Sequence, residues 1–187
     1  METEEKFVAI KNLCLASSSK DPLELAEEIM RKDFISVNGP EHHMLDGAAF
    51  LTAYKNAGGQ LDLPSALDEL AKRARLMPGA MCGYWGVCGA VASLGASFSI
   101  INKISPLSHE KGYKDNMAYT SSVLKSMSGI GGPRCCKRNA FLAITYAVKF
   151  AQEQYGIKMD VSKPKCEFAS LNKQCLGPSC PFYPRNK

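Results

Sequence analysis

The residues of this 187-residue chain best suited to chemistry are its eight cysteines. Three of them form the arrangement Cys166-x8-Cys175-x4-Cys180-Pro near the C-terminus. Thiolates bind soft metals, and a Cys-Pro pair also ends the ligand run of bacterial ferredoxins. The spacing matches neither that run nor the short Cys-x2–4-Cys pairs of zinc fingers. We therefore expect these three cysteines to bind a metal, with reduced surface thiols as the alternative.

Two adjacent cysteines, Cys135 and Cys136, lie at an expected helix start beside Arg134, Lys137 and Arg138. The amide groups of a first helical turn and nearby cations both favour the thiolate. Neighbouring helical residues differ by about 100° in direction, so we expect one thiol to complete the metal site and the other to face the core or a neighbouring cavity. Arg134 and Arg138 would offset the negative charge of a thiolate-bound cluster. The alternative is that one cysteine packs as a small apolar residue and the other has no role.

A second group combines Cys82 and Cys88 with two histidines, His42 and His43. Glycines in MCGYWGVCGA expose amide groups that can hydrogen-bond sulfur, and Cys88 falls at a helix start. His42 and His43 also open a helix, where the neutral imidazole that serves as ligand or base is favoured. We expect these four residues to be catalytic and to line the face of the site where the reaction takes place. The alternatives are a close helix crossing for the cysteines, and a cap and a core contact for the histidines.

Length and composition indicate a cytoplasmic protein with reduced thiols. The chain is long enough to form a core without disulfides, and METEEKFVAIKNL lacks the features of a signal peptide. The apolar stretch around residues 87–101 is too short to span a bilayer, so no membrane association is expected. SGIGGPRCCKR follows a helical segment and has no Gly-Lys-Ser/Thr ending, which disfavours a nucleotide-binding loop but leaves anion binding open.

Charge is divided unevenly along the chain. Residues 1–70 hold 13 acidic and 6 basic side chains, whereas residues 71–187 hold 5 acidic and 17 basic ones. A basic region is typical of proteins that bind nucleic acid or another anion. A cluster held by four thiolates is itself an anion that cations stabilise, so composition leaves both interpretations open.

Helix signals recur along the chain and strand signals are few. Asp21 followed by Pro22 is typical of a helix start, and Gly58 of a helix end. We predict a mainly α-helical, single-domain bundle over residues 1–187, with about six helices and a cysteine-rich metal-binding tail over 165–187. The helices are expected within residues 19–33, 38–59, 62–79, 86–103, 108–129 and 133–156, and residues 157–161 as a short strand or extended chain.

Four segments in order resemble the cysteine-rich family catalogued as domain of unknown function 5714. They are GPEHHMLDGAAFL, CGYWGVCGAVASLGASFSII, GGPRCCKRNAFLAI and CEFASLNKQCLGPSCPFYP, and the resemblance covers about residues 35–184. It implies an anaerobic archaeal or bacterial setting and a cytosolic location. In that family the domain occurs alone or beside a methyltransferase domain, and no such second domain is expected here. The resemblance implies little about the substrate.

Together these patterns predict an iron–sulfur protein with a redox or sulfur-handling role. Cys166, Cys175 and Cys180 with Cys135 or Cys136 would hold the cluster, most simply a [4Fe–4S] cluster. Its partner would be an unidentified small molecule or protein. The alternative is a zinc-stabilised binding module for RNA or for a partner enzyme such as a methyltransferase.

Overall fold

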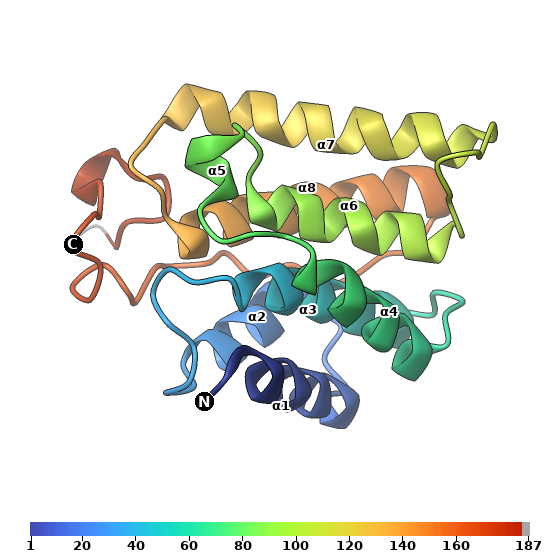
Figure 1. Cartoon of the computed structure of the whole chain (residues 1–187), viewed down its shortest axis with the longest axis horizontal. Helices are drawn as coiled ribbons and strands as arrows, with labels where there is room; N and C mark the ends of the chain where they lie inside the picture. Colours follow the sequence, from blue (N-terminus) through green and yellow to red (C-terminus); the bar gives the residue numbers. More distant parts are fainter. Residues whose placement is uncertain (185–187) are drawn as a thin grey trace.

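A computed structural model describes residues 1–184, which form eight α-helices and no strand (Figure 1). The helices are α1 (Thr3–Ala16), α2 (Pro22–Met30), α3 (His42–Asn56), α4 (Leu63–Arg75), α5 (Met81–Tyr84), α6 (Gly89–Ile101), α7 (Lys111–Ile130) and α8 (Cys136–Tyr155), and a short 3₁₀ turn follows at Gly177–Ser179. In this part of the chain no helix combines the length and apolar character needed to cross a bilayer. The last three residues of the predicted tail, 185–187, lie outside the described residues.

The mainly helical class is confirmed, but the number of helices is higher than the six predicted. The first additional helix is α1, whose buried Phe7, Ile10 and Cys14 follow helical spacing. The second is α5, a single turn that is too short to produce a periodic pattern. Residues 157–161 are extended chain without a strand. The predicted start of α2 is confirmed, because Asp21 Oδ1 accepts hydrogen bonds from the amides of Leu23 and Glu24 at 2.9 and 3.1 Å.

The centre of the bundle is α3, which packs against α1, α2, α4, α6 and α8. Every residue from His42 to Tyr54 is buried, which explains why no amphipathic stripe marks this helix. Its closest neighbour is α6. The Ser93 hydroxyl donates to the His43 carbonyl at 2.6 Å and accepts from the Gly47 amide at 2.9 Å. These bonds fix the start of α3 against α6.

The far end of the bundle is filled by aromatic rings that pack edge to face. Phe98 lies at the centre of this group, with its ring centroid 4.8 to 5.0 Å from those of Phe50, Tyr119 and Phe150. The rigid aromatic end leaves the opposite end, where α3, α6 and α8 begin, as the place where polar residues gather. Figure 1 shows α5 and the C-terminal loops at that same end.

The C-terminal segment is held to the bundle by a few specific contacts. The Asp160 amide donates to the Lys20 carbonyl at 3.0 Å, and Arg31 pairs with Glu167 at 2.8 Å. Phe182 stacks edge to face on Phe141 of α8, with centroids 5.4 Å apart. The segment has more apolar anchorage than its sequence pattern indicates, because its contacts are single side chains rather than a periodic stripe.

Candidate functional site

Two cavities meet at the start of α8. The first has a volume of about 250 Å³ and is enclosed by the starts of α3, α6 and α8 and by α5. The second is about 10 Å³, room for about one water molecule, and lies between α8 and the C-terminal loops. Cys135 lines both cavities.

Four cysteines line the second cavity. They are Cys135, Cys166, Cys175 and Cys180, so the structure brings the three tail cysteines together with one of the paired thiols. Each of these sulfurs accepts a backbone N–H. The donors are the amides of Arg138 to Cys135 at 3.4 Å, of Gly177 to Cys175 at 3.3 Å, of Phe168 to Cys166 and of Phe182 to Cys180. The Asn172 side-chain amide adds a second donor to Cys135 at 3.5 Å.

These hydrogen bonds favour the thiolate form of the cysteines, whereas burial favours the protonated thiol. Burial raises the pKa of Cys166 and of Cys180, while the amides of Phe168 and Phe182 act in the opposite direction. Amide groups directed at all four sulfurs are typical of thiolates that bind a metal. A bound cation would supply the compensation that burial demands.

Lys137 is a buried cation in the wall of the second cavity. Its side chain is 1% exposed, and its ammonium nitrogen has no hydrogen-bond partner. Burial lowers the pKa of Lys137 to about 8, and the nitrogen lies 4.6 Å from the centroid of the Phe168 ring. An unpaired buried ammonium is costly. Four thiolates that hold a metal group would together carry a net negative charge, which would offset that cost.

The two arginines predicted for cofactor binding have different surroundings. Arg138 is buried and lines the second cavity, where its guanidinium donates to the carbonyls of Gly131 and Pro133 at 3.1 and 3.0 Å. Arg134 is exposed and lines the first cavity instead. Arg138 therefore lies in the wall of the second cavity, and Arg134 does not.

The arrangement of sulfurs distinguishes between kinds of metal site. Among the side chains of residues 1–184, no three His, Cys, Asp or Glu converge closely enough to hold a single metal ion. A tetrahedral zinc site needs such convergence, since each sulfur lies about 2.3 Å from the ion. Sulfurs spread around a cavity suit a larger inorganic group.

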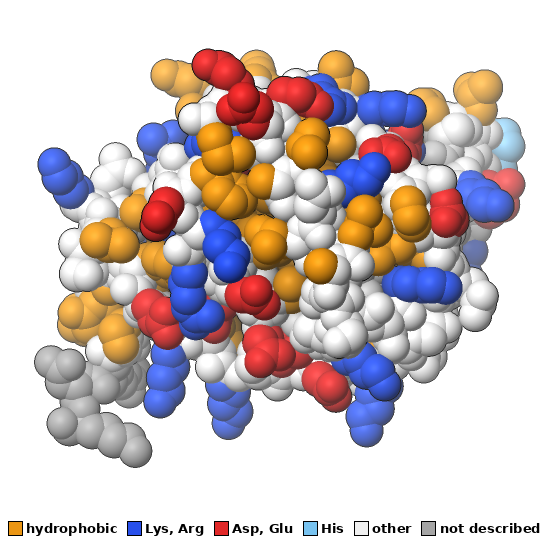
Figure 2. All heavy atoms as spheres, turned by 90° about the horizontal axis from the view of Figure 1, so that it is seen from below, with side chains coloured by type: hydrophobic (Ala, Val, Ile, Leu, Met, Phe, Trp, Pro, Cys, Tyr) orange, Lys and Arg blue, Asp and Glu red, His pale blue; other side chains and the backbone are white. Residues whose placement is uncertain are grey.

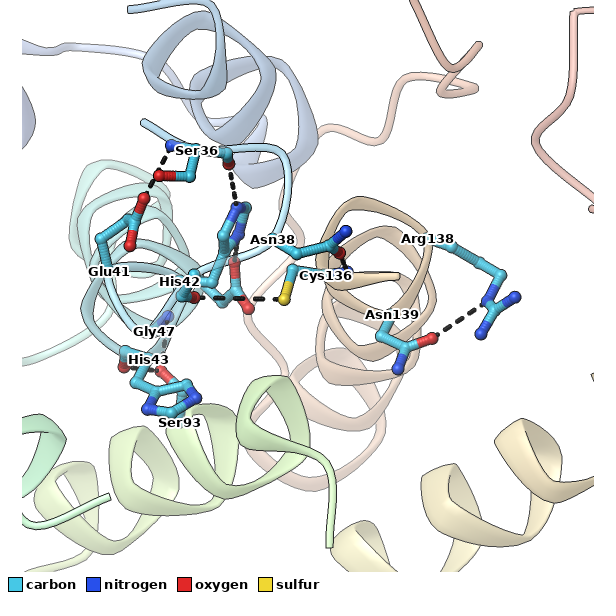
Figure 3. Close-up of polar contacts among 12 residues, drawn as sticks. Ser36, Asn38, Glu41, His42, His43, Gly47, Ser93, Cys136, Arg138 and Asn139 are labelled. Atoms are coloured by element: carbon cyan, nitrogen blue, oxygen red, sulfur yellow. Dashed lines mark hydrogen bonds and ion pairs between the residues drawn. The ribbon is translucent and has the colours of Figure 1, made fainter. Parts of the chain in front are cut away.

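Cys136 is separated from the metal-site candidates. It is the first residue of α8, and its amide donates to Asn38 Oδ1 at 2.9 Å. Its sulfur lies 4.0 Å from the Gly39 carbonyl and lines the first cavity, toward the start of α3 (Figure 3). The prediction that a helix start lowers the thiol pKa is wrong here. Burial raises the pKa of Cys136 to about 12, because desolvation outweighs the helix terminus.

Cys88 lies at the N-cap of α6 and lines the first cavity. Its sulfur accepts from Asn139 Nδ2 at 3.2 Å and from the amides of Ala90 and Val91. Burial nevertheless raises the pKa of Cys88, so this thiol is also protonated at neutral pH. Cys82 lies on α5, half-buried, and lines the same cavity.

The two histidines line the first cavity in different roles. His42 lies with Nδ1 3.4 Å from Asp46 Oδ1 and Nε2 3.4 Å from the Ser36 carbonyl, so both ring nitrogens face acceptors (Figure 3). His43 Nδ1 donates to the Met77 carbonyl at 3.2 Å, which leaves Nε2 as a free lone pair. Burial lowers the pKa of His43, so its imidazole is neutral, as expected for this helix start.

The sequence profile of the "Family of unknown function (DUF5714)" matches residues 10–183. The chain belongs to this family. No curated protein and no solved structure matches the chain. For this DUF5714 chain, the geometry of the site is therefore the basis for assigning its chemistry.

Sequence reasoning missed three polar residues of this DUF5714 site: Asp46, Lys137 and Asn139. Asp46 follows His42 by one helical turn, a spacing that could have suggested a pair. Asn139 lies one turn after Cys135, but its contact is with Cys88 of another helix. In the sequence Lys137 is one of several neighbouring cations. Its burial depends on how the C-terminal segment folds back over α8.

Proposed function

We propose that this protein binds an iron–sulfur cluster through Cys135, Cys166, Cys175 and Cys180, and that it has a redox or sulfur-handling role in a reducing cytoplasm. One observation carries the proposal. Four cysteine sulfurs line one cavity, each accepts a backbone N–H, and the unpaired ammonium of Lys137 lies in the same wall. A [4Fe–4S] cluster held by four thiolates carries the negative charge that this ammonium requires.

The place of the four cysteines beside the larger cavity supports a role in chemistry rather than in stability alone. When bound, a cluster would supply electrons or a site for sulfur. Cys135 forms part of the wall between the two cavities. Ligands of the 250 Å³ cavity would therefore lie next to one cluster ligand, facing Cys136, Cys88 and His43.

The competing proposal is a zinc-stabilised module that binds RNA or a partner enzyme such as a methyltransferase. An RNA-binding face normally presents a continuous basic surface. Figure 2 shows acidic and basic side chains intermixed over the face that carries α1. The ion pairs Lys11–Asp68 and Arg75–Glu4 join α1 to α4. The described part of this face offers no such basic surface.

Anaerobic purification tests the proposal directly. We expect brown protein containing iron and acid-labile sulfide, with visible absorption that bleaches in air. Cys175→Ser and Cys180→Ser should each lose iron, because each removes one of four ligands from the second cavity.

Cys82→Ser is the matched control, since Cys82 lines the first cavity and not the second. It should retain iron. A colourless protein carrying one tightly bound zinc would favour the competing proposal, and full iron content in both tail variants would reject the ligand assignment.

A further inference from the structure

The 250 Å³ cavity contains a thiol and a base that the cluster proposal does not use. Four cysteines line it, and one of them, Cys135, is already used by the cluster proposal. Of the other three, Cys82, Cys88 and Cys136, only Cys88 is surrounded by donors, namely Asn139 Nδ2 and the first amides of α6. The Cys136 sulfur instead lies against a carbonyl acceptor. No hydrogen bond reaches the Cys82 sulfur from the described residues. Cys88 is thus the cavity thiol whose surroundings stabilise a developing thiolate.

His43 supplies an unpartnered base beside Cys88. His43 is only 6% exposed, and its Nδ1 donates to the Met77 carbonyl, which fixes the proton on that nitrogen. Nε2 lies against Gly89, the residue that follows Cys88: a Cβ atom built on Gly89 would lie 2.2 Å from Nε2. A neutral imidazole with a fixed tautomer and a free Nε2 is the form that accepts a proton from a thiol.

The rest of the cavity favours an anion. Its volume is about 250 Å³, and a more open pocket of about 450 Å³ shares Cys88 and Arg134 with it. Arg134 is the exposed cation of its lining, and the starts of α6 and α8 contribute positive partial charge. The one buried acid, Asp46, faces His42 through Oδ1.

We infer that Cys88 is a nucleophile that accepts a sulfane sulfur from a small anionic donor held by Arg134, with His43 as the base. The class of donor is an anion in which a terminal sulfur is bonded to a better leaving group, as in thiosulfate or a small organic persulfide. This role rests on the sulfur-handling function proposed above and names its substrate class.

The step balances without an added oxidant. The Cys88 thiol gives its proton to His43 Nε2, and its sulfur attacks the terminal sulfur of the donor. A new S–S bond forms as the S–S bond of the donor breaks, and sulfite, or the donor thiolate, leaves with the bonding electron pair. Asn139 and the amides of α6 hold the negative charge on the Cys88 sulfur before attack.

Thiosulfate is the probe, added anaerobically to the purified full-length protein. We expect intact mass to rise by one sulfur atom, and peptide mapping to place that sulfur on Cys88. Cys88→Ser should show no uptake while remaining folded, since serine is a favourable N-cap residue for α6. Cys82→Ser and Cys136→Ser, which remove the other two cavity thiols that the cluster proposal does not use, should retain uptake.

Two further variants separate binding of the anion from reactivity of the thiol. Arg134→Gln should slow uptake from thiosulfate about tenfold relative to alkylation of Cys88 by neutral iodoacetamide. Lys125→Gln, an exposed cation on α7, should leave both rates unchanged. His43→Gln should slow both reactions by about 100-fold at a fixed pH, since a general base contributes to each.

Failure here is distinguishable from failure of the cluster proposal. Brown, iron-containing protein that takes up no sulfur, or takes it up equally in Cys88→Ser, would overturn the role of Cys88 and leave the cluster intact. Colourless protein that still takes up sulfur on Cys88 would support this role and reject the cluster. Equal slowing of thiosulfate and iodoacetamide reactions in Arg134→Gln would overturn the selection of an anion.

Discussion

The adjacent thiols of Cys135 and Cys136 show how one step along a helix changes the chemistry of a residue. Cys135 is the N-cap of α8, and its sulfur accepts two hydrogen bonds in the wall shared by both cavities. Cys136 begins the helix and turns toward the start of α3, where its pKa is raised. The two thiols therefore have different surroundings despite sharing a peptide bond.

We predict an asymmetric response of the metal site to substitution of this pair. Cys135→Ser should lose iron, because it removes a sulfur from the second cavity. Cys136→Ser should keep iron and change only the number of thiols that react with alkylating reagents. Iron analysis of both variants, purified side by side without oxygen, checks this. Equal losses in the two proteins would show that both sulfurs bind the metal, contrary to the geometry.

Cys14 is a buried residue of α1, and we predict that it makes the stability of the protein depend on pH. Burial raises the pKa of Cys14 to about 12 from its ordinary value of 9.0. The unfolded chain loses this proton above pH 9.0 while the folded protein keeps it, so the free energy of unfolding falls as pH rises from 9.0 toward 12. Below that window the contribution is fully present.

Urea unfolding of wild type and Cys14→Ala tests this dependence. The variant should be less stable at about pH 8, because it leaves a small cavity. The difference between the two proteins should shrink by about 1.4 kcal/mol at about pH 10, one unit above the ordinary thiol pKa. Other buried thiols contribute equally to both proteins and cancel. A constant difference across this range would contradict the assignment.

The crossing of α3 and α6 depends on a glycine in the middle of a helix. A Cβ atom on Gly47 would lie 2.6 Å from Ser97 Oγ and 2.7 Å from Ser93 Oγ, closer than real contacts. Substituting glycine by alanine ordinarily stabilises a helix by about 1 kcal/mol. Here the steric clash outweighs that gain, and Ser93 also carries the bonds that hold the start of α3.

We therefore predict that Gly47→Ala lowers the free energy of unfolding by about 1–3 kcal/mol. The matched control is Gly129→Ala on α7, where nothing lies within 4 Å of the added Cβ atom and the site is exposed. That variant should be stabilised by about 0.5–1 kcal/mol. Denaturant unfolding measures both, and a stabilised Gly47→Ala would show that the helices separate more easily than the structure indicates.

Across the whole molecule, the C-terminal loops and the helical bundle have different sources of order. The bundle rests on one continuous apolar core. The loops rest on few contacts, among them Phe182 on Phe141 and the Arg31–Glu167 pair. Loss of the metal should therefore release the loops before it affects the helices.

Limited trypsin digestion of Cys180→Ser should cleave after Lys165 and Lys173 while the helical bundle resists. Both lysines lie in the segment that carries Cys166, Cys175 and Cys180. Wild type loaded with metal and Cys82→Ser should resist cleavage at these positions. Protection of both lysines in Cys180→Ser would mean that apolar contacts alone order the segment.

Ion pairs join the acidic and the basic part of the sequence in the folded chain. Glu4 of the acidic part pairs with Arg75, and Glu167 of the basic part pairs with Arg31. Folding thus mixes charges that the sequence separates. Among the described residues, Lys137 is a buried cation whose ammonium has no hydrogen bond, and it lies beside the four cysteines.

The amino-acid pattern was enough to predict the helical class, the Asp21 cap, most helix positions and the types of residue at the site. These features depend on local spacing, caps and the intrinsic chemistry of thiols, which act within a few residues. Two helices were not predicted: α1, whose buried residues follow helical spacing, and α5, whose single turn gives no periodic pattern.

Three features of the site depend on tertiary structure. They are which cysteine faces the tail, the burial of Lys137 without a hydrogen-bond partner, and the shared cavity of His43 and Cys88. The contacts responsible join distant parts of the chain: Cys136 to Asn38 across 98 residues, and Arg31 to Glu167 across 136. Burial in turn set the raised pKa of Cys136 and Cys88, against the local influence of their helix starts. Desolvation depends on every segment packed around a group, so no local pattern can reveal it.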